Sequence, residues 1–126
     1  MFVHHERVRF RDLDALGHVN NAVFLTYIES ARVAFLLDLG AAATLEDMSI
    51  IVARIEIDFL APVGFGEEVE IAVRASRFGD KSFDLDYELR VGGRVVAVAK
   101  SVLVGYDYAK GETVTIPDEW RERLAA

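Results

Sequence analysis

Most of the chain alternates between polar and apolar residues with the period of two that is typical of half-buried β-strands. The predicted strands cover residues 3–10, 54–59, 69–75, 82–91 and 95–104. The last of these runs is apolar on both faces, which indicates a central strand. Gly92-Gly93 separates the last two runs, and this pair is a strong hairpin signal because glycine accepts the positive φ of the primed turns.

One segment departs from this alternation and predicts a long helix. Residues 21–39 contain neither glycine nor proline, and apolar side chains fill most of the circumference, as expected of a buried helix. Asn20 is the predicted N-cap, and Gly40 is the predicted residue just beyond the helix. A short second helix is predicted to start at Pro117. A strand, a long helix and four antiparallel strands predict an α+β fold in which the sheet curls around the helix.

The composition fits one globular domain over residues 1–126. The sequence has no cysteine, so disulfides, thiolate nucleophiles and cysteine-ligated metals are excluded. A net charge of −7 argues against a nucleic-acid partner, because such proteins bind phosphates mainly with Lys and Arg. No apolar stretch nears the roughly 18 residues of a membrane span, and no N-terminal targeting pattern is visible. We therefore expect a soluble protein with no membrane partner and a cytoplasmic location.

The segment between the first strand and the long helix holds the candidate chemistry. It contains the carboxylates of Asp12 and Asp14, the imidazole of His18 and the amides of Asn20 and Asn21. The first N–H groups of a helix lack intrahelical partners and lie at the positive end of its dipole, so they can stabilise a carbonyl oxygen that becomes negative. A nearby Asp can act as nucleophile or general base. The structural alternative is that both Asp side chains form Asx-turns, His18 is a loop residue and Asn20 only caps the helix.

The run Arg-Phe-Arg-Asp-Leu-Asp-Ala-Leu-Gly-His-Val-Asn-Asn at 9–21, with Tyr-Ile-Glu-Ser-Ala-Arg at 27–32, resembles the signature of hot-dog-fold thioesterases of the 4-hydroxybenzoyl-CoA thioesterase type. The resemblance implies a hot-dog fold, with a five-stranded antiparallel sheet wrapped around one long buried helix. It also implies hydrolysis of acyl thioesters, most of all coenzyme A esters, to free acid and thiol. By this resemblance Asp14 is the catalytic carboxylate, the main-chain N–H of Asn21 polarises the thioester carbonyl, and His18 assists. Asn20 is then a substrate-binding residue, and no metal or other cofactor is implied.

A second segment, Gly-Asp-Lys-Ser-Phe at 79–83, resembles the region of the same family that contacts coenzyme A phosphates. It implies that Lys81 and Ser82 bind substrate, with Lys81 the one basic residue kept of the family's three. The resemblance also implies a homodimer joined edge to edge, or a homotetramer, with each site built by two subunits. A free edge strand in so small a sheet makes such pairing physically reasonable.

Glu29 is a competing carboxylate on the long helix. It lies eight residues beyond Asn21, or about 12 Å along the helix, which is far from the amides of the candidate site. Its spacing to Arg32 suits an i, i+3 ion pair, so we interpret Glu29 as structural. The alternating acids Asp84, Asp86 and Glu88 are interpreted as a solvated sheet face or a face that meets a partner subunit.

Several alternatives stay open at this point. The carboxylate can attack directly or activate water, and the thiol can belong to coenzyme A or to an acyl carrier protein. A non-catalytic module that binds acyl-CoA is a second class of function for the same fold. The acyl group is not indicated, and Phe24, Leu25 and Ile28 are candidates for the pocket wall.

Overall fold

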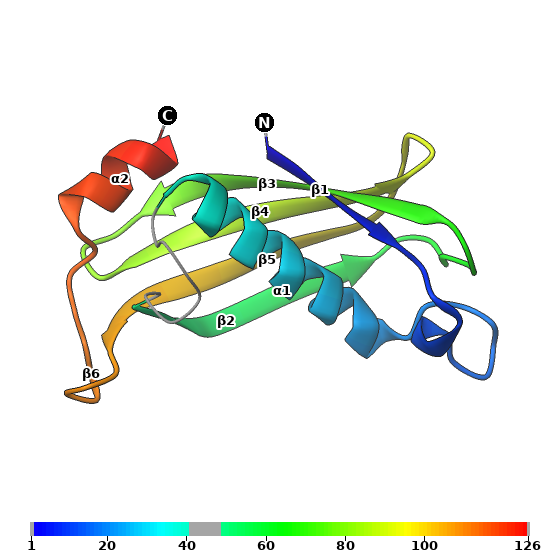
Figure 1. Ribbon diagram of the computed structural model, residues 1–126, viewed down its shortest axis with the longest axis horizontal. Coiled ribbons are helices and arrows are strands. Elements are labelled where there is room, and N and C mark those ends of the chain that lie inside the picture. Colours follow the sequence, from blue (N-terminus) through cyan, green and yellow to red (C-terminus); the bar gives the residue numbers. More distant parts are fainter. Residues whose placement is uncertain (1, 41–48, 126) are drawn as a thin grey trace.

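The computed structural model of the protein describes residues 2–40 and 49–125 (Figure 1). The elements in chain order are β1 (Phe2–Arg7), the 3-10 turn η1 (Phe10–Asp12), α1 (Asn21–Asp38), β2 (Ile50–Phe59), β3 (Glu68–Phe78), β4 (Ser82–Val91), β5 (Arg94–Asp107), β6 (Glu112–Thr113) and α2 (Asp118–Ala125). Within these residues, no helix is both long enough and apolar enough to cross a membrane.

The strands form one antiparallel sheet in the order β1-β3-β4-β5-β2, and β6 pairs with the end of β5. The predicted α+β architecture with five main strands is confirmed, with β5 inside the sheet and β1 and β2 at its edges. The β4–β5 turn has Gly92 at φ 56° and Gly93 at φ 81°, as the hairpin signal requires. The short β6 was not predicted, because two residues carry no periodicity.

The first strand is shorter than its alternation predicts. β1 ends at Arg7, Val8 still exchanges backbone hydrogen bonds with Gly66 and Glu67, and η1 begins at Phe10. The N–H of Arg9 donates to the Asp12 carboxylate at 2.9 Å, and the Phe10 side chain is 80% exposed. The predicted strand was therefore wrong for its last three residues, and from Arg9 onward the Asp12 side chain replaces a neighbouring strand as the partner of the backbone.

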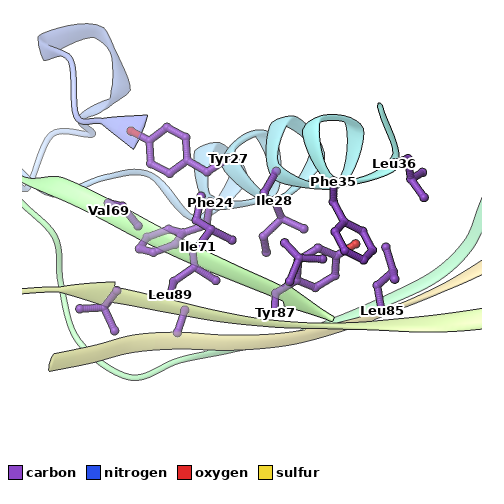
Figure 2. Close-up of a cluster of buried hydrophobic side chains, with 14 of the residues drawn as sticks. Phe24, Tyr27, Ile28, Phe35, Leu36, Val69, Ile71, Leu85, Tyr87 and Leu89 are labelled. Atoms are coloured by element: carbon purple, nitrogen blue, oxygen red, sulfur yellow. The ribbon is translucent and has the colours of Figure 1, made fainter. Parts of the chain in front are cut away.

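Helix α1 crosses one face of the sheet, and the core lies between them (Figures 1 and 2). The core residues of the helix and the three central strands include Phe24, Tyr27, Ile28, Phe35, Leu36, Ile71, Leu85, Tyr87 and Leu89. Ile28, Leu36 and Leu85 have no exposed surface, and full burial of such side chains contributes about 1.5–3 kcal/mol each. The prediction that the helix is buried is confirmed for the face that packs on the sheet. Leu25, Thr26 and Glu29 on the opposite face are exposed, because the sheet covers only one side of α1.

Both predicted ends of the long helix are confirmed. The Asn20 side chain accepts a hydrogen bond from the N–H of Ala22 at 2.8 Å, and Gly40 adopts a φ of 70° just after the helix. At the same end, the Arg123 guanidinium of α2 donates to the carbonyls of Leu39 and Gly40, at 3.2 and 2.6 Å. These contacts fix where α1 begins and ends, and α2 itself follows Pro117 as predicted.

The acidic series on the outer sheet face is only partly solvated. Asp84 is 5% exposed, and Arg77 donates to its carboxylate at 2.9 Å. Asp86 lies between Arg74 at 3.5 Å and Lys100 at 3.7 Å on the neighbouring strands. The interpretation of Asp84 as a solvated residue was wrong, because Arg77 folds over it.

Candidate active site

The chain between η1 and α1 forms a small closed loop. Leu13 and Val19 make an isolated antiparallel bridge, and the N–H of Asp14 donates to the His18 carbonyl at 2.8 Å. Gly17 adopts a φ of 80° at the tip, and its N–H donates to the Asp14 carbonyl at 3.0 Å. A residue with a side chain rarely adopts this φ, so the glycine lets the loop close. Asp14 and His18 are consequently paired across the loop, close to the start of α1.

The Asp14 carboxylate is half-buried and has one oxygen in use. Its Oδ1 accepts a hydrogen bond from the N–H of Leu16 at 2.9 Å, so the predicted Asx-turn is present. Its Oδ2 has no hydrogen-bond partner among the residues that the structure describes. The turn therefore orients the carboxylate and leaves its second oxygen available to a substrate.

A cavity of about 400 Å³ lies beside this loop. Asp14, His18 and Asn21 contribute its polar lining. The rest of the lining comes from the loop, from α1 and from the end of β2 with the residues after it: Leu16, Val19, Phe24, Phe59, Leu60, Ala61 and Pro62. The structure thus brings the three residues predicted to be catalytic to one cavity with an apolar wall, as a site for an acyl group requires.

The main-chain N–H of Asn21 is the candidate donor to a substrate carbonyl oxygen. Asn21 is the first residue of α1, and within residues 2–40 and 49–125 its N–H has no hydrogen-bond partner. The N–H groups of Ala22 and Val23, by contrast, both donate to Asn20. An unpaired amide at the positive end of a helix dipole can stabilise a developing oxyanion.

The predicted substrate-binding residues do not line this cavity. The Asn20 side chain serves as the N-cap of α1. Ser82 is in register with Val104 of β5, whereas Phe59 at the cavity is in register with Ala97. Seven residues of strand separate these positions, or roughly 23 Å. Within one chain, Lys81 and Ser82 therefore lie at the far end of the sheet from Asp14. Figure 1 shows the start of β4 and the start of α1 at opposite ends of the sheet.

Glu29 lies away from this cavity, as its spacing from Asn21 predicts. Its side chain is 69% exposed, lies 3.9 Å from the Arg32 guanidinium and does not line the cavity. Of the three helix residues considered for the pocket wall, only Phe24 lines it, because Leu25 points outward and Ile28 is enclosed in the core. Phe24 contacts Phe59 edge to face at 5.3 Å between ring centroids, so an aromatic pair forms part of the apolar wall.

A buried pair beneath the loop was missed by the sequence reasoning. The Tyr27 hydroxyl donates to Asp12 Oδ2 at 2.6 Å, and both residues are buried. Burial would raise the pKa of Asp12, but hydrogen bonds from Tyr27 and from the Arg9 N–H, together with the Arg9 charge, hold it below its usual value. Burial, and then Asp12 itself, raise the pKa of Tyr27. The two residues are 15 positions apart, so no local spacing indicates the contact.

In the described residues, no group of three or more His, Cys, Asp or Glu side chains could hold a metal ion. The polar lining of the cavity comes from a carboxylate, an imidazole and the first residue of α1, beside an apolar wall.

An antiparallel sheet curled on one long helix, with this site at the helix N-terminus, defines the class of hot-dog-fold thioesterases. Comparison with known proteins agrees. A family model described as the thioesterase-like superfamily matches residues 8–124, and the chain belongs to that superfamily.

Individual relatives carry names of acyl-CoA hydrolases. A 1,4-dihydroxy-2-naphthoyl-CoA hydrolase of Nostoc punctiforme is 30% identical over 94% of this chain and 82% of its own. The long-chain acyl-CoA thioesterase FadM of Escherichia coli is 30% identical over 94% of this chain and 92% of its own. Among solved structures, a Thermus thermophilus thioesterase in complex with coenzyme A and Zn is 38% identical. It superimposes with a TM-score of 0.89 over 97% of this chain and 90% of that one.

Proposed function

We propose that the protein is an acyl-CoA thioesterase that hydrolyses its substrate to a free acid and coenzyme A. The observation that carries the proposal is that one cavity with an apolar wall is lined by Asp14 and by Asn21, whose main-chain N–H has no partner among the described residues. Membership of the thioesterase-like superfamily supports the reaction type. The names of the relatives support coenzyme A as the thiol.

In the proposed reaction, the thioester carbonyl oxygen accepts a hydrogen bond from the Asn21 N–H, which stabilises the negative charge formed on attack. In one route Asp14 attacks the carbonyl carbon, the C–S bond breaks, and coenzyme A leaves as a thiolate that takes up a proton. Water then opens the mixed anhydride and releases the acid. In the other route Asp14 removes a proton from a water molecule that attacks instead. His18 lies at the same cavity and is proposed to hydrogen-bond the substrate.

A carrier-protein ester is the weaker alternative. The chain carries a net charge of −7, and acyl carrier proteins are acidic, so long-range repulsion disfavours their encounter. Coenzyme A is also anionic, but it is small enough to be met by a few local cations.

We also propose that the protein is a homodimer joined through β2. This edge strand has ten residues and exposes Ile51, Val52 and Phe59. The other edge strand, β1, has six residues and carries charged and histidine side chains, which protect an edge from pairing. Phe59 also lines the cavity, so a partner that pairs with β2 lies against the proposed site.

In such a dimer, Lys81 and Ser82 of each subunit are proposed to lie near the cavity of the other subunit. A two-fold axis at this edge pairs the strands antiparallel and brings the Ile50 end of one β2 to the Phe59 end of the other. Lys81 of the partner subunit then approaches the cavity and can meet a coenzyme A phosphate. Two such dimers can associate further into the homotetramer that the family resemblance implies.

The test of the function is thiol release from acyl-CoAs that range from acetyl to palmitoyl and include benzoyl and phenylacetyl esters. Asp14→Asn is compared with the wild type, and Glu29→Gln is the matched control because it neutralises the rival carboxylate on α1. We expect Asp14→Asn to lower the rate at least about 100-fold and Glu29→Gln to leave it nearly unchanged.

The opposite ranking of the two variants would overturn the role of Asp14. A wild-type protein that releases no thiol from any ester but is thermally stabilised by acyl-CoA would instead be a binding module.

A further inference from the structure

Asp12 is a buried carboxylate that takes no direct part in the proposed reaction. It lies two residues before Asp14, is 5% exposed and does not line the cavity. Its Oδ2 accepts hydrogen bonds from the Tyr27 hydroxyl at 2.6 Å and from the Arg9 N–H at 2.9 Å. Its backbone carbonyl accepts a third, from the N–H of Asn20 at 3.0 Å. Asp12 thus joins the start of η1, the N-cap of α1 and the second turn of α1.

Tyr27 is the helix side of this junction. It is 1% exposed, and its ring packs in the core beside Phe24, at 6.4 Å between centroids. Figure 2 shows its hydroxyl directed away from the other core side chains, toward the chain that follows β1. The same environment that raises its pKa keeps the phenol protonated, so it remains a donor to Asp12.

The tip and the base of the loop are held differently. Residues 15–18 at its tip are all exposed, so no packed side chain fixes them against the body of the protein. The base of the loop is held by two backbone hydrogen bonds, from the Val19 N–H to the Val63 carbonyl at 2.8 Å and from the Asn20 N–H to the Asp12 carbonyl at 3.0 Å. The placement of the loop relative to α1 depends on this base, where Asp12 and Val19 are buried.

We propose that Asp12 and Tyr27 form a positioning pair, which holds the Asp14 loop against α1 and thereby sets the distance between the Asp14 carboxylate and the Asn21 N–H. This role rests on the proposed thioesterase function. Neither residue touches substrate. Both act through the geometry of the two groups that do, and a misplacement of about 1 Å in such a pair costs on the order of 100-fold in rate.

The test compares Tyr27→Phe with Tyr87→Phe. Tyr87 is the matched control, because it is 2% exposed and its hydroxyl also has one buried partner, Ser101 Oγ at 2.7 Å, on strands away from the cavity. Each variant removes one oxygen from a buried hydrogen bond, and we expect the larger fall in thermal stability in Tyr27→Phe, because its partner is a carboxylate, so both variants are assayed well below their unfolding temperatures. Only Tyr27→Phe is expected to lower kcat, by about tenfold or more, with KM changed less than about twofold.

Asp12 is tested by rescue. Asp12→Asn keeps a carbonyl oxygen that can accept from Tyr27 and Arg9, whereas Asp12→Ala keeps none. We expect kcat to fall in the order wild type, Asp12→Asn, Asp12→Ala. A second measurement, independent of activity, is hydrogen exchange at the amides of Asp14 and Asn20, which should accelerate in Tyr27→Phe and not in Tyr87→Phe.

Equal kcat in the two tyrosine variants, or unchanged exchange in Tyr27→Phe, would overturn the positioning role while leaving the proposed function intact. Absence of thiol release by the wild type would overturn the function itself, and the positioning role with it. Faster exchange in Tyr27→Phe together with a selective loss of kcat supports both.

Discussion

Replacement of Asn20 by alanine separates its structural role from a role in substrate binding. The Asn20 side chain makes one contact that alanine cannot make, the 2.8 Å hydrogen bond from the Ala22 N–H. Loss of an N-cap of this kind costs about 1 kcal/mol, which is roughly a fivefold change in the unfolding equilibrium. For a chain of 126 residues this corresponds to a decrease in Tm of about 3–5 °C.

The activity of the same variant follows from the position of the cap. Asn20 precedes the residue whose main-chain N–H is proposed to hold the oxyanion, so fraying of the first turn of α1 displaces that N–H. Asn20→Ala should therefore lose kcat as well as stability. Asn20→Ser is the matched control, because serine caps a helix about as well as asparagine but lacks the amide group.

The assay is thermal unfolding and steady-state thiol release on the same preparations of the three proteins. If Asn20 only caps the helix, Asn20→Ser resembles the wild type in Tm and in both kinetic constants. If its amide binds substrate, Asn20→Ser keeps the wild-type Tm and shows a raised KM. An Asn20→Ala protein with the Tm of the wild type would refute the claim that the Asn20 side chain stabilises α1 as its N-cap.

Two further predictions concern the stability of the fold at low pH and the β2 edge. The pKa of Asp12 lies below its ordinary 3.8 in the folded protein, so its ionised form stabilises the fold above that pH, and this contribution disappears as the pH falls through the lowered pKa. By urea unfolding, Asp12→Asn should have a lower free energy of unfolding than the wild type at pH 7 and should lose less of it between about pH 4 and pH 2. If the free energies of unfolding of the two proteins change in parallel with pH, the prediction is wrong. At the β2 edge, the wild type should sediment as a dimer of the 14.0 kDa chain or as a pair of such dimers, and Ile51→Lys should shift it toward the monomer with loss of activity. Val3→Lys on the opposite edge is the control, since Val3 is 40% exposed and Ile51 is 42% exposed; dissociation by both variants, or a monomeric active wild type, would exclude the β2 dimer.

The elements of the fold could be predicted because their signals are local. The alternation of β4 and β5, the Gly92-Gly93 turn and the two ends of α1 each depend on residues close in sequence. The end of β1 could not be predicted, because Phe10 continues the alternation, whereas the contact of Arg9 with Asp12 and the backbone bonds of η1 end the strand. The burial of Asp84 likewise depends on Arg77 from the neighbouring strand.

The candidate site also has one part that the sequence could predict and one part that it could not. Asp14, His18 and Asn21 belong to one contiguous motif, and the structure places them at one cavity. The facing wall at Phe59–Pro62 lies at the end of β2 and just after it, about forty residues further along, and no spacing in the sequence connects it to the motif. Asp12 and Tyr27 fall within the same signature, but their contact requires the helix to be docked first.

The Asx-turn at Asp14 makes the two oxygens of that carboxylate chemically inequivalent. Oδ1 is committed to the Leu16 N–H, and in the proposed reaction only Oδ2 is left to attack a carbonyl or to accept a proton. Asparagine at this position can keep Oδ1 in the turn while an amide nitrogen replaces Oδ2. The loop then keeps its shape and loses only the atom that reacts, so the loss of rate in Asp14→Asn measures the chemistry of one oxygen atom and not the collapse of the loop that carries it.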